Sequence, residues 1–247
     1  MNRQEKTDAD VLIVGAGASG LAAACAAASA GASVIAVDGN DRAGRKLSAT
    51  GNGRCNLTNT NCGSEKYNEN AMAFVERVFR RFHYSDTVRL FQESGLLIRE
   101  EQEGRCYPYS GQASAVTELL TEKAGSLGAR FELGDTVSDC FTEDSRFHAV
   151  FTSGKRLTAR SLILASGGRA GLQFGSTGDG YGFAKRFGHT LRAPAPALVA
   201  CESDDPRLSG LKGRARALVT LFEDGKEKYS EYGEVQFTGS GLSGICV

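Results

Sequence analysis

The chain has 247 residues, of which 41% are hydrophobic and 23% are charged, a composition typical of a folded globular protein. Lys and Arg together number 29, as do Asp and Glu, so no net field favours nucleic acid or an acidic membrane surface as a partner. Seven cysteines without a C-x-x-C pair argue against a disulfide framework and a zinc site. No stretch is apolar enough for a transmembrane helix, and we expect a metal-free, cytoplasmic protein.

The first pattern along the chain is a strand, a glycine-rich turn and a helix. Residues 11–14 form an apolar run, Gly15, Gly17 and Gly20 have the G-x-G-x-x-G spacing, and residues 21–30 are small and helix-forming. In such a motif the first glycine permits the tight turn, the second lets a pyrophosphate approach the backbone, and the third lets the helix pack on the sheet. The free N–H groups and the positive dipole end of the helix then favour the phosphates.

The next strand, residues 33–37, ends at Asp38, whose carboxylate is placed to accept hydrogen bonds from an adenosine ribose. Ser19 adds a hydroxyl donor near the start of the helix. A lone G-x-G-x-x-G is equally compatible with a glycine-rich turn followed by a surface aspartate. The full order of strand, helix, strand and acid predicts a dinucleotide site.

A second polar loop follows, and no helix or strand period is visible in residues 41–59. Cationic and amide donors on a glycine-rich backbone suit a phosphate or the edge of a flavin. A solvated, flexible loop is the alternative interpretation. The loop carries Arg42, Arg45, Lys46 and Arg54 among Ser48, Thr50, Asn52, Asn56 and the glycines Gly44, Gly51 and Gly53.

The run RKLSATGNGRCNLTN resembles a bacterial flavoprotein family, the BaiN-like or aminoacetone-oxidase-like FAD-binding enzymes. Two further segments resemble motifs of that family, GRCYP at 104–108 and GSTGDGY at 175–181, so the resemblance covers almost the whole chain. It implies an α/β fold with a Rossmann-like, glutathione-reductase-type FAD-binding domain. It also implies FAD as the cofactor and NAD(P)H as the electron donor.

The resemblance also implies the residues of the cofactor site. Gly15, Gly17, Ala18, Ser19 and Gly20 would meet the pyrophosphate, Asp38 the ribose, and the backbone of Val137 the adenine, while residues 162–168 would approach the flavin as a buried strand. Asp38 departs from the glutamate usual in the family, and its shorter side chain lies further from a ribose. The other implied positions are Gly39, Arg45, Lys46, Ser48, Thr50, Gly51, Asn52, Cys55, Asn56, Ser166, Gly167 and Gly168.

The rest of the first part of the chain is predicted as an α-rich insertion followed by strands. Helical spacing covers residues 71–82, 86–93 and 114–126, and a β stretch covers 130–158 with hairpin-like turns at Gly134 and Gly154. Residues 178–187 are predicted as a short helix. Thr177 or Asp179 is placed to cap its first N–H groups, and capping is the preferred role for Asp179 over flavin contact.

Pro194 and Pro196 mark a change of character, which predicts an FAD-binding domain over residues 1–192 and a second, β-rich region over 193–247. In the family that region is an inserted substrate domain, after which the chain returns to complete the flavin fold. The resemblance therefore implies a chain truncated at its C-terminus, which is a fragment or is completed by a partner subunit.

The resemblance implies reduction of a carbon–carbon double bond conjugated to a ketone in a small, steroid-like or bile-acid-like substrate, or oxidation of an amino-ketone. The alternatives are a truncated flavin-fold protein without turnover and a nicotinamide dehydrogenase, which has no need of the second polar loop. Candidate proton donors are Tyr107, Tyr109, Tyr181 and His189. Cys55 is interpreted as a loop residue rather than a redox thiol.

Overall fold

The computed structural model describes residues 7–197, 199–244 and 246–247. The chain divides into two compact units, with the boundary along the chain between Leu191 and Arg192. Each unit has its own sheet. In the described part of the chain, no helix combines the length and the apolar character needed to cross a membrane. The assignment of the second unit to an inserted substrate domain stays a prediction.

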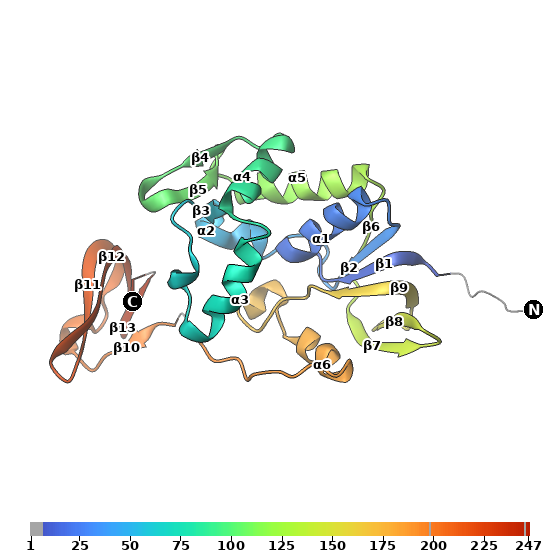
Figure 1. Ribbon diagram of the computed structural model, residues 1–247. Helices are drawn as coiled ribbons and strands as arrows, with labels where there is room; N and C mark the ends of the chain where they lie inside the picture. The colour runs from blue at the N-terminus through green and yellow to red at the C-terminus, as the bar shows by residue number, and fades with distance from the viewer. Residues whose placement is uncertain (1–6, 198, 245) are drawn as a thin grey trace, which may run out of the picture. The chain divides into compact units, whose positions relative to one another are not determined.

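The first unit is built on a six-stranded sheet with the strand order β6-β2-β1-β9-β8-β7 (Figure 1). Its parallel part contains β1 (Ala9–Val14), β2 (Val34–Asp38), β6 (Arg130–Leu133) and β9 (Arg156–Leu164). Parallel neighbours need a crossover, and α1 (Ala18–Ser29) supplies the one between β1 and β2. These are the expected strand, turn, helix and strand, and the α/β Rossmann-like fold is confirmed.

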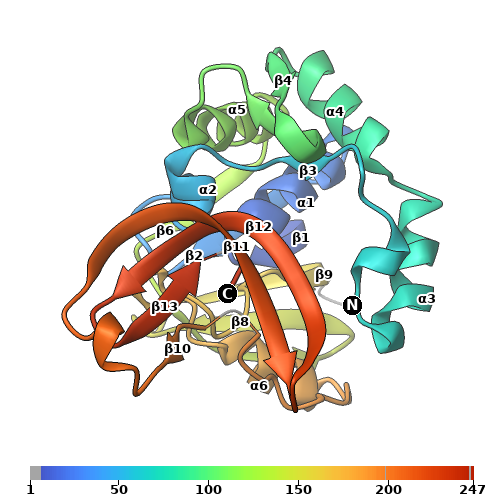
Figure 2. The same cartoon turned by 90° about the vertical axis from the view of Figure 1, so that its left-hand side faces the viewer.

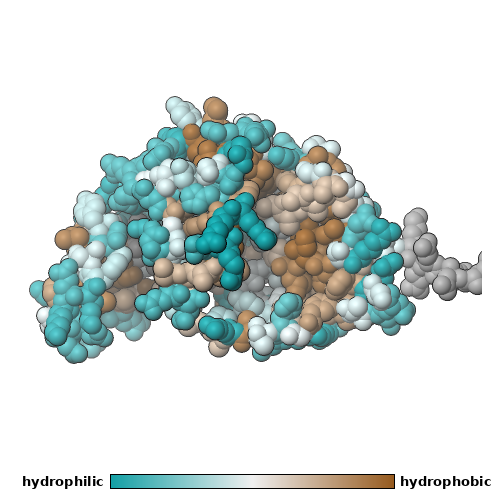
Figure 3. All heavy atoms as spheres, viewed as in Figure 1, coloured by the Kyte–Doolittle hydropathy of each residue, from teal (hydrophilic) through white to brown (hydrophobic). Residues whose placement is uncertain are grey.

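Two apolar clusters cover the two faces of this sheet. Along β1, Ile13 packs with α1 and α5 (Ala113–Ser126), whereas Leu12 and Val14 pack with the opposite cluster. Because strand side chains alternate between faces, a strand buried on both sides is apolar throughout, as VLIV is. The outward side of α1 carries alanines, which give the pale brown surface over this helix in Figure 3.

The antiparallel part of the same sheet is a meander of β7 (Val137–Glu143), β8 (Arg146–Phe151) and β9, and residues of β7 and β8 join Leu12 and Val14 in the second apolar cluster. The expected turn at Gly154 joins β8 to β9 and is confirmed. The hairpin expected at Gly134 is wrong, because β6 pairs with β2 and β7 with β8. A glycine predicts where the chain turns, but not which strands then pair.

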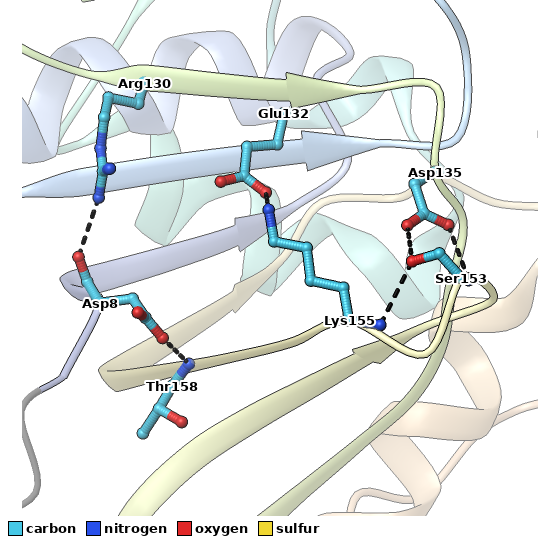
Figure 4. Close-up of polar contacts among 7 residues, drawn as sticks. All are labelled: Asp8, Arg130, Glu132, Asp135, Ser153, Lys155 and Thr158. Carbon is cyan, nitrogen blue, oxygen red and sulfur yellow. Dashed lines mark hydrogen bonds and ion pairs between the residues drawn. The ribbon is translucent and has the colours of Figure 1, made fainter.

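Polar contacts connect this turn region to the rest of the sheet (Figure 4). Lys155 pairs with Glu132 of β6, and Ser153 bonds Asp135 in the β6–β7 connection. The backbone N–H of Thr152 donates to the carbonyl of Thr136 at 2.8 Å. The β8–β9 turn therefore lies against the connection that follows β6.

The insertion between β2 and β6 is α-rich, as expected, with a small sheet of its own. Its helices are α3 (Glu69–Phe79), α4 (Tyr84–Glu93) and α5. The three-stranded sheet has the order β3 (Thr58–Asn59), β5 (Arg105–Pro108), β4 (Ile98–Glu100). Short 3-10 turns lie at Leu47–Ala49, Ser64–Lys66, Gln102–Gly104, Leu172–Phe174 and Pro206–Leu208. After β9, the first unit ends with α6 (Asp179–Arg186).

The second unit is an antiparallel sheet with the order β10 (Cys201–Glu202), β13 (Gly241–Gly244), β12 (Lys226–Thr238), β11 (Lys212–Glu223). Figure 2 shows the long β11–β12 hairpin and β13 beside β12. The strands expected near residues 216–222 and 235–238 are present and longer than expected, because one hairpin ladder pairs Lys212 through Glu223 with β12.

Candidate functional site

The first unit contains a cavity of about 470 Å³ at the carboxyl ends of β1, β2 and β9. Ligands of open α/β sheets bind outside the carboxyl ends of the strands, so this is the expected position for a nucleotide. The cavity is lined by the glycine turn, the end of β2, the start of the second polar loop, the β6–β7 connection and the segment between β9 and α6. Segments far apart in the sequence therefore meet at one edge of the sheet.

The glycines of the turn have two different roles. A Cβ at Gly20 would lie 1.8 Å from the carbonyl oxygen of Gly15, and one at Gly15 would lie 2.4 Å from the carbonyl oxygen of Ala165. Gly15 also has φ +106°, which only glycine adopts without strain. A Cβ at Gly17 would have no atom within 4 Å, and Gly17 borders the cavity. Two glycines allow backbone packing, and the third leaves open space where a pyrophosphate would approach.

The N-terminus of α1 opens onto this space. The N-cap residue Gly17 makes no side-chain cap, the first helical bond runs from Leu21 N–H to Gly17 C=O, and Ala18 and Ser19 border the cavity. The N–H groups of a first turn have no partner within the helix, and the helix dipole adds about half a positive charge. The site fits a bound pyrophosphate without a basic side chain.

Asp38 borders the cavity with a carboxylate that is already hydrogen-bonded within the protein. Its Oδ2 accepts from the Ala16 N–H at 2.8 Å, and its Oδ1 accepts from the backbone N–H and side-chain amide of Asn40 at 2.9 and 2.8 Å. A carboxylate accepts about four hydrogen bonds, so one position remains for a ribose hydroxyl. The shorter aspartate reaches back to the glycine turn, and its ribose contact stays a prediction.

Gly39 and Val137 also border the cavity. A Cβ at Gly39 would lie 2.5 Å from the Thr136 hydroxyl, so glycine here lets the β6–β7 connection approach β2 closely. That approach places Val137 beside the end of β2. The geometry is compatible with the adenine role that the family resemblance implies for Val137.

Four residues of the second polar loop border the cavity: Arg45, Lys46, Leu47 and Thr50. Arg45 Nη1 donates to Asn40 Oδ1 at 2.8 Å, and the Thr50 hydroxyl donates to the carbonyl of Leu47 at 2.6 Å. Lys46 Nζ donates to Ser176 Oγ at 2.8 Å. The basic residues therefore contact neighbouring segments of the cavity wall.

The other implied loop residues lie away from the cavity wall. Ser48 shares a hydrogen bond of 3.1 Å with Thr117 on α5, and Gly51, Asn52 and Asn56 are exposed. The stretch labelled α2 (Thr50–Gly53) is not a regular helix, because Gly51 and Asn52 have φ of 56° and 55°. Their contact with a cofactor stays a prediction.

Cys55 is 2% exposed, and its left-handed φ of 58° is uncommon for a residue with a side chain. Burial raises the pKa of its thiol, although a hydrogen bond from Thr50 partly opposes the shift. All seven cysteines are free thiols. Cys55 is therefore a packed, protonated thiol within the loop.

The segment after β9 forms the opposite wall. Ser166 and Gly167 border the cavity, while Gly168 lies against Tyr181, whose hydroxyl would be 2.6 Å from a Cβ there. Sequence reasoning missed several lining residues of this wall and its surroundings: Asn40, Thr136, Phe174, Gly175, Ser176, Thr177 and Phe183. The GSTGDGY run was the available signal for Gly175, Ser176 and Thr177, whereas Thr136 and Phe183 had no local signal.

The capping role expected for Asp179 is wrong. Gly178, with φ +85°, occupies the N-cap position of α6 and provides no side-chain cap. The Thr177 hydroxyl instead donates to the Asp179 carboxylate at 2.6 Å. A glycine at this turn allows the left-handed backbone that a capping side chain would not favour.

The candidate proton donors differ in accessibility. Tyr109 and His189 are exposed, and Tyr107 is buried with the Arg54 guanidinium 4.1 Å from its ring centre. The Tyr181 hydroxyl lies against Gly168, which follows the lining residue Gly167 in the chain. Among the described residues, no group of three or more His, Cys, Asp or Glu side chains is placed to hold a metal ion.

Comparisons with known proteins agree with this geometry. A profile described as HI0933-like protein Rossmann domain matches residues 9–243. The chain is 35% identical over 241 residues to the 3-dehydro-bile acid delta(4,6)-reductase of Clostridium scindens, covering 95% of this chain and 58% of the relative. It is 30% identical to the ribosomal RNA dihydrouridine synthase of Haemophilus influenzae, covering 96% and 59%.

Among solved structures, the 3-ketosteroid-delta4-(5alpha)-dehydrogenase from Rhodococcus jostii RHA1 is 19% identical with a TM-score of 0.49, covering 67% of this chain and 47% of that one. The chain spans just under three fifths of the length of the two curated relatives named above. The family profile covers nearly all of the chain, and the resemblance drawn from the loop motifs is confirmed. The chain belongs to the HI0933-like family of FAD-binding Rossmann proteins, whose members are FAD-dependent oxidoreductases.

Proposed function

We propose that the protein is a cytoplasmic enzyme that uses FAD and NAD(P)H to reduce a carbon–carbon double bond conjugated to a carbonyl in a small hydrophobic substrate. The observation that carries the FAD site is the open space at Gly17, where the uncapped N-terminus of α1 meets the carboxylate of Asp38. The chemistry that FAD supplies when bound is hydride transfer through flavin N5, from NAD(P)H to an electron-poor carbon.

The type of substrate bond is supported by what two relatives' names have in common. A delta(4,6)-reductase of a 3-dehydro bile acid acts on double bonds conjugated to the 3-keto group, and dihydrouridine is uridine with a double bond next to a carbonyl reduced. Both products result from adding a hydride and a proton across such a bond. The relative at 35% identity favours the steroid-like substrate, and the balanced charge of the chain gives no electrostatic support for RNA.

Different residues of the chain would bind different parts of FAD. Gly17 and the first turn of α1 would hold the pyrophosphate, and Asp38 would offer its remaining acceptor position to the ribose. The reaction also needs a proton at the carbon next to the carbonyl. We assign this role to Tyr181, whose hydroxyl lies against Gly168, the residue that follows the lining residues Ser166 and Gly167.

Two alternatives remain open to experiment. The first alternative is a flavin-fold protein without turnover, or one completed by a partner subunit. It is considered because the chain spans 58–59% of the length of its curated relatives. Amino-ketone oxidation by the same cofactor is the second. The first predicts no reduction of any substrate by the isolated chain, and the second predicts oxygen consumption with an amino-ketone.

The deciding experiment is the visible spectrum of the purified chain, with chromatographic identification of any nucleotide released on denaturation. A yellow protein that releases FAD supports the site, and its bleaching by NADH or NADPH under nitrogen identifies the donor. The bleached protein is then mixed with a 4-ene-3-keto steroid or a uridine-containing RNA. In a separate sample the yellow protein is mixed with an amino-ketone under nitrogen, where oxidation of the amino-ketone would bleach the flavin. Return of the yellow colour with the steroid alone supports the proposal, whereas a colourless protein that does not take up added FAD contradicts it.

A further inference from the structure

The cavity wall between β9 and α6 is a segment with little regular structure of its own. Residues 165–178 contain one 3-10 turn, Leu172–Phe174, and the glycines Gly167, Gly171 and Gly175 have φ of 81°, 79° and 83°. Because glycine has no Cβ, it loses more backbone freedom on folding than any other residue. Ordering this glycine-containing segment therefore has a high entropic cost. Contacts with the rest of the unit must offset that cost for the wall to be formed.

Lys46 makes two such contacts from the second polar loop. Its Nζ donates to Ser176 Oγ at 2.8 Å and to the carbonyl of Ala170 at 3.1 Å. It also lies beside Gly167, where a Cβ would be 3.7 Å from Nζ. One ammonium group thus bonds the middle and the end of the segment and lies near its start.

The burial and bonding of these partners indicate a persistent contact. Ser176 is 5% exposed, and Lys46 is half-buried. Hydrogen bonds from a charged donor are stronger than those between neutral groups, and the buried Ser176 hydroxyl would lose its partner if Lys46 were removed. Asn40, just after β2, also contacts this segment. Its Nδ2 donates to the Phe174 carbonyl at 3.3 Å, which is longer than the two Lys46 bonds.

We propose that Lys46 is a positioning residue that holds residues 165–178 in place as the cavity wall before any nucleotide binds. In this role its ammonium contacts Ser176 and Ala170 rather than a phosphate of the cofactor. The ordering of the segment follows from the contacts of the chain itself, and only its consequence for FAD binding rests on the proposed function.

The test of ordering uses the 247-residue chain without added nucleotide. Lys46→Met keeps the length of the side chain and removes all of its donors. Loss of two charge-assisted hydrogen bonds should raise the open fraction of the segment about tenfold or more. Trypsin cleavage after Arg169 and deuterium exchange of the 165–178 peptide, both read by mass spectrometry, should accelerate by that factor while α1 peptides stay unchanged.

Matched variants make the assignment specific. Arg45→Met removes a neighbouring cation that contacts Asn40 and should leave cleavage after Arg169 at the original rate. Ser176→Ala should accelerate cleavage less than Lys46→Met, because the Ala170 contact remains, and the double variant should be no worse than Lys46→Met alone. Lys46→Arg, which keeps the charge and donors, should restore part of the protection.

FAD binding, followed by flavin fluorescence, separates this inference from the proposed function. If Lys46 acts by positioning the segment, Lys46→Met should weaken FAD binding only by the factor by which it lowers the closed fraction of the segment, because the apparent Kd is the intrinsic Kd divided by that fraction. Weaker FAD binding with an unchanged cleavage rate would make Lys46 a direct ligand and overturn the inference. If no variant binds FAD, the proposed function fails, but the cleavage rates still decide the role of Lys46.

Discussion

The two loops that meet at the cavity are held in opposite ways. The glycine turn, residues 15–20, is fixed by backbone atoms packed so closely that Cβ atoms at Gly15 and Gly20 have no room. The second loop shares a backbone bond with this turn, from the Gly44 N–H to the Ala16 carbonyl, but it contacts the rest of the cavity wall through side chains: Arg45 on Asn40, and Lys46 on Ser176. A loop packed through its backbone should fail completely when altered, whereas one held by side chains should lose its function by degrees.

The largest effect is expected from Gly20→Ala. The new Cβ would lie 1.8 Å from the Gly15 carbonyl oxygen, and backbone on both sides leaves nothing flexible to move away. We expect a loss of about 3 kcal/mol or more in the free energy of unfolding, which urea denaturation would measure. Unfolding at the original urea concentration would show that the turn relaxes and would remove the contrast between the loops.

Gly17→Ala is the matched change at the open glycine. Gly17 has φ −79° and ψ −167°, which alanine adopts, and no atom lies within 4 Å of the new Cβ. The midpoint of unfolding should therefore stay close to that of the original chain. FAD binding, measured by fluorescence, should weaken at least about tenfold because the methyl group occupies the space of the pyrophosphate. Unchanged FAD affinity would contradict the placement of the pyrophosphate.

Asp38→Asn probes the side chain that connects the glycine turn with the second loop. The amide keeps one acceptor oxygen, so either the Ala16 N–H or the Asn40 donors lose their partner. We expect a loss of about 1–3 kcal/mol in the free energy of unfolding together with weaker FAD binding. Asn40→Ala, which leaves the Ala16 contact intact, serves as the control and should destabilise the unit less.

Proton release from Cys55 should give the smallest effect. Burial raises the pKa of this thiol, so its stabilising contribution is complete below the unfolded value, about 8.5, and is lost as the pH rises through the higher folded value. Cys55→Ala should therefore lose less stability than the original chain in urea titrations between about pH 8 and pH 11. An identical pH dependence in the two proteins would contradict a buried, protonated thiol.

The two loops also differ in how much of their structure the sequence could predict. The strand, turn, helix and acid from β1 to Asp38 follow local rules, because each glycine and the carboxylate occupy positions set by spacing along one crossover. The second loop could be recognised as functional from its motif. Its contacts could not, since the partner of Lys46 lies 130 positions away at Ser176.

The sequence by itself determined the Rossmann-like fold and the glycine turn, because periodic apolar residues and glycine spacing act over short stretches of chain, and the resemblance of its loop motifs identified the FAD-binding family. Only the tertiary structure decided that β6 and β7 do not pair, that Asp38 bonds the glycine turn and Asn40, and that no side chain caps α6, whose N-cap position is Gly178. These outcomes depend on which distant segments pack together, and local spacing does not encode the partners that a polar side chain or a strand edge finds after packing.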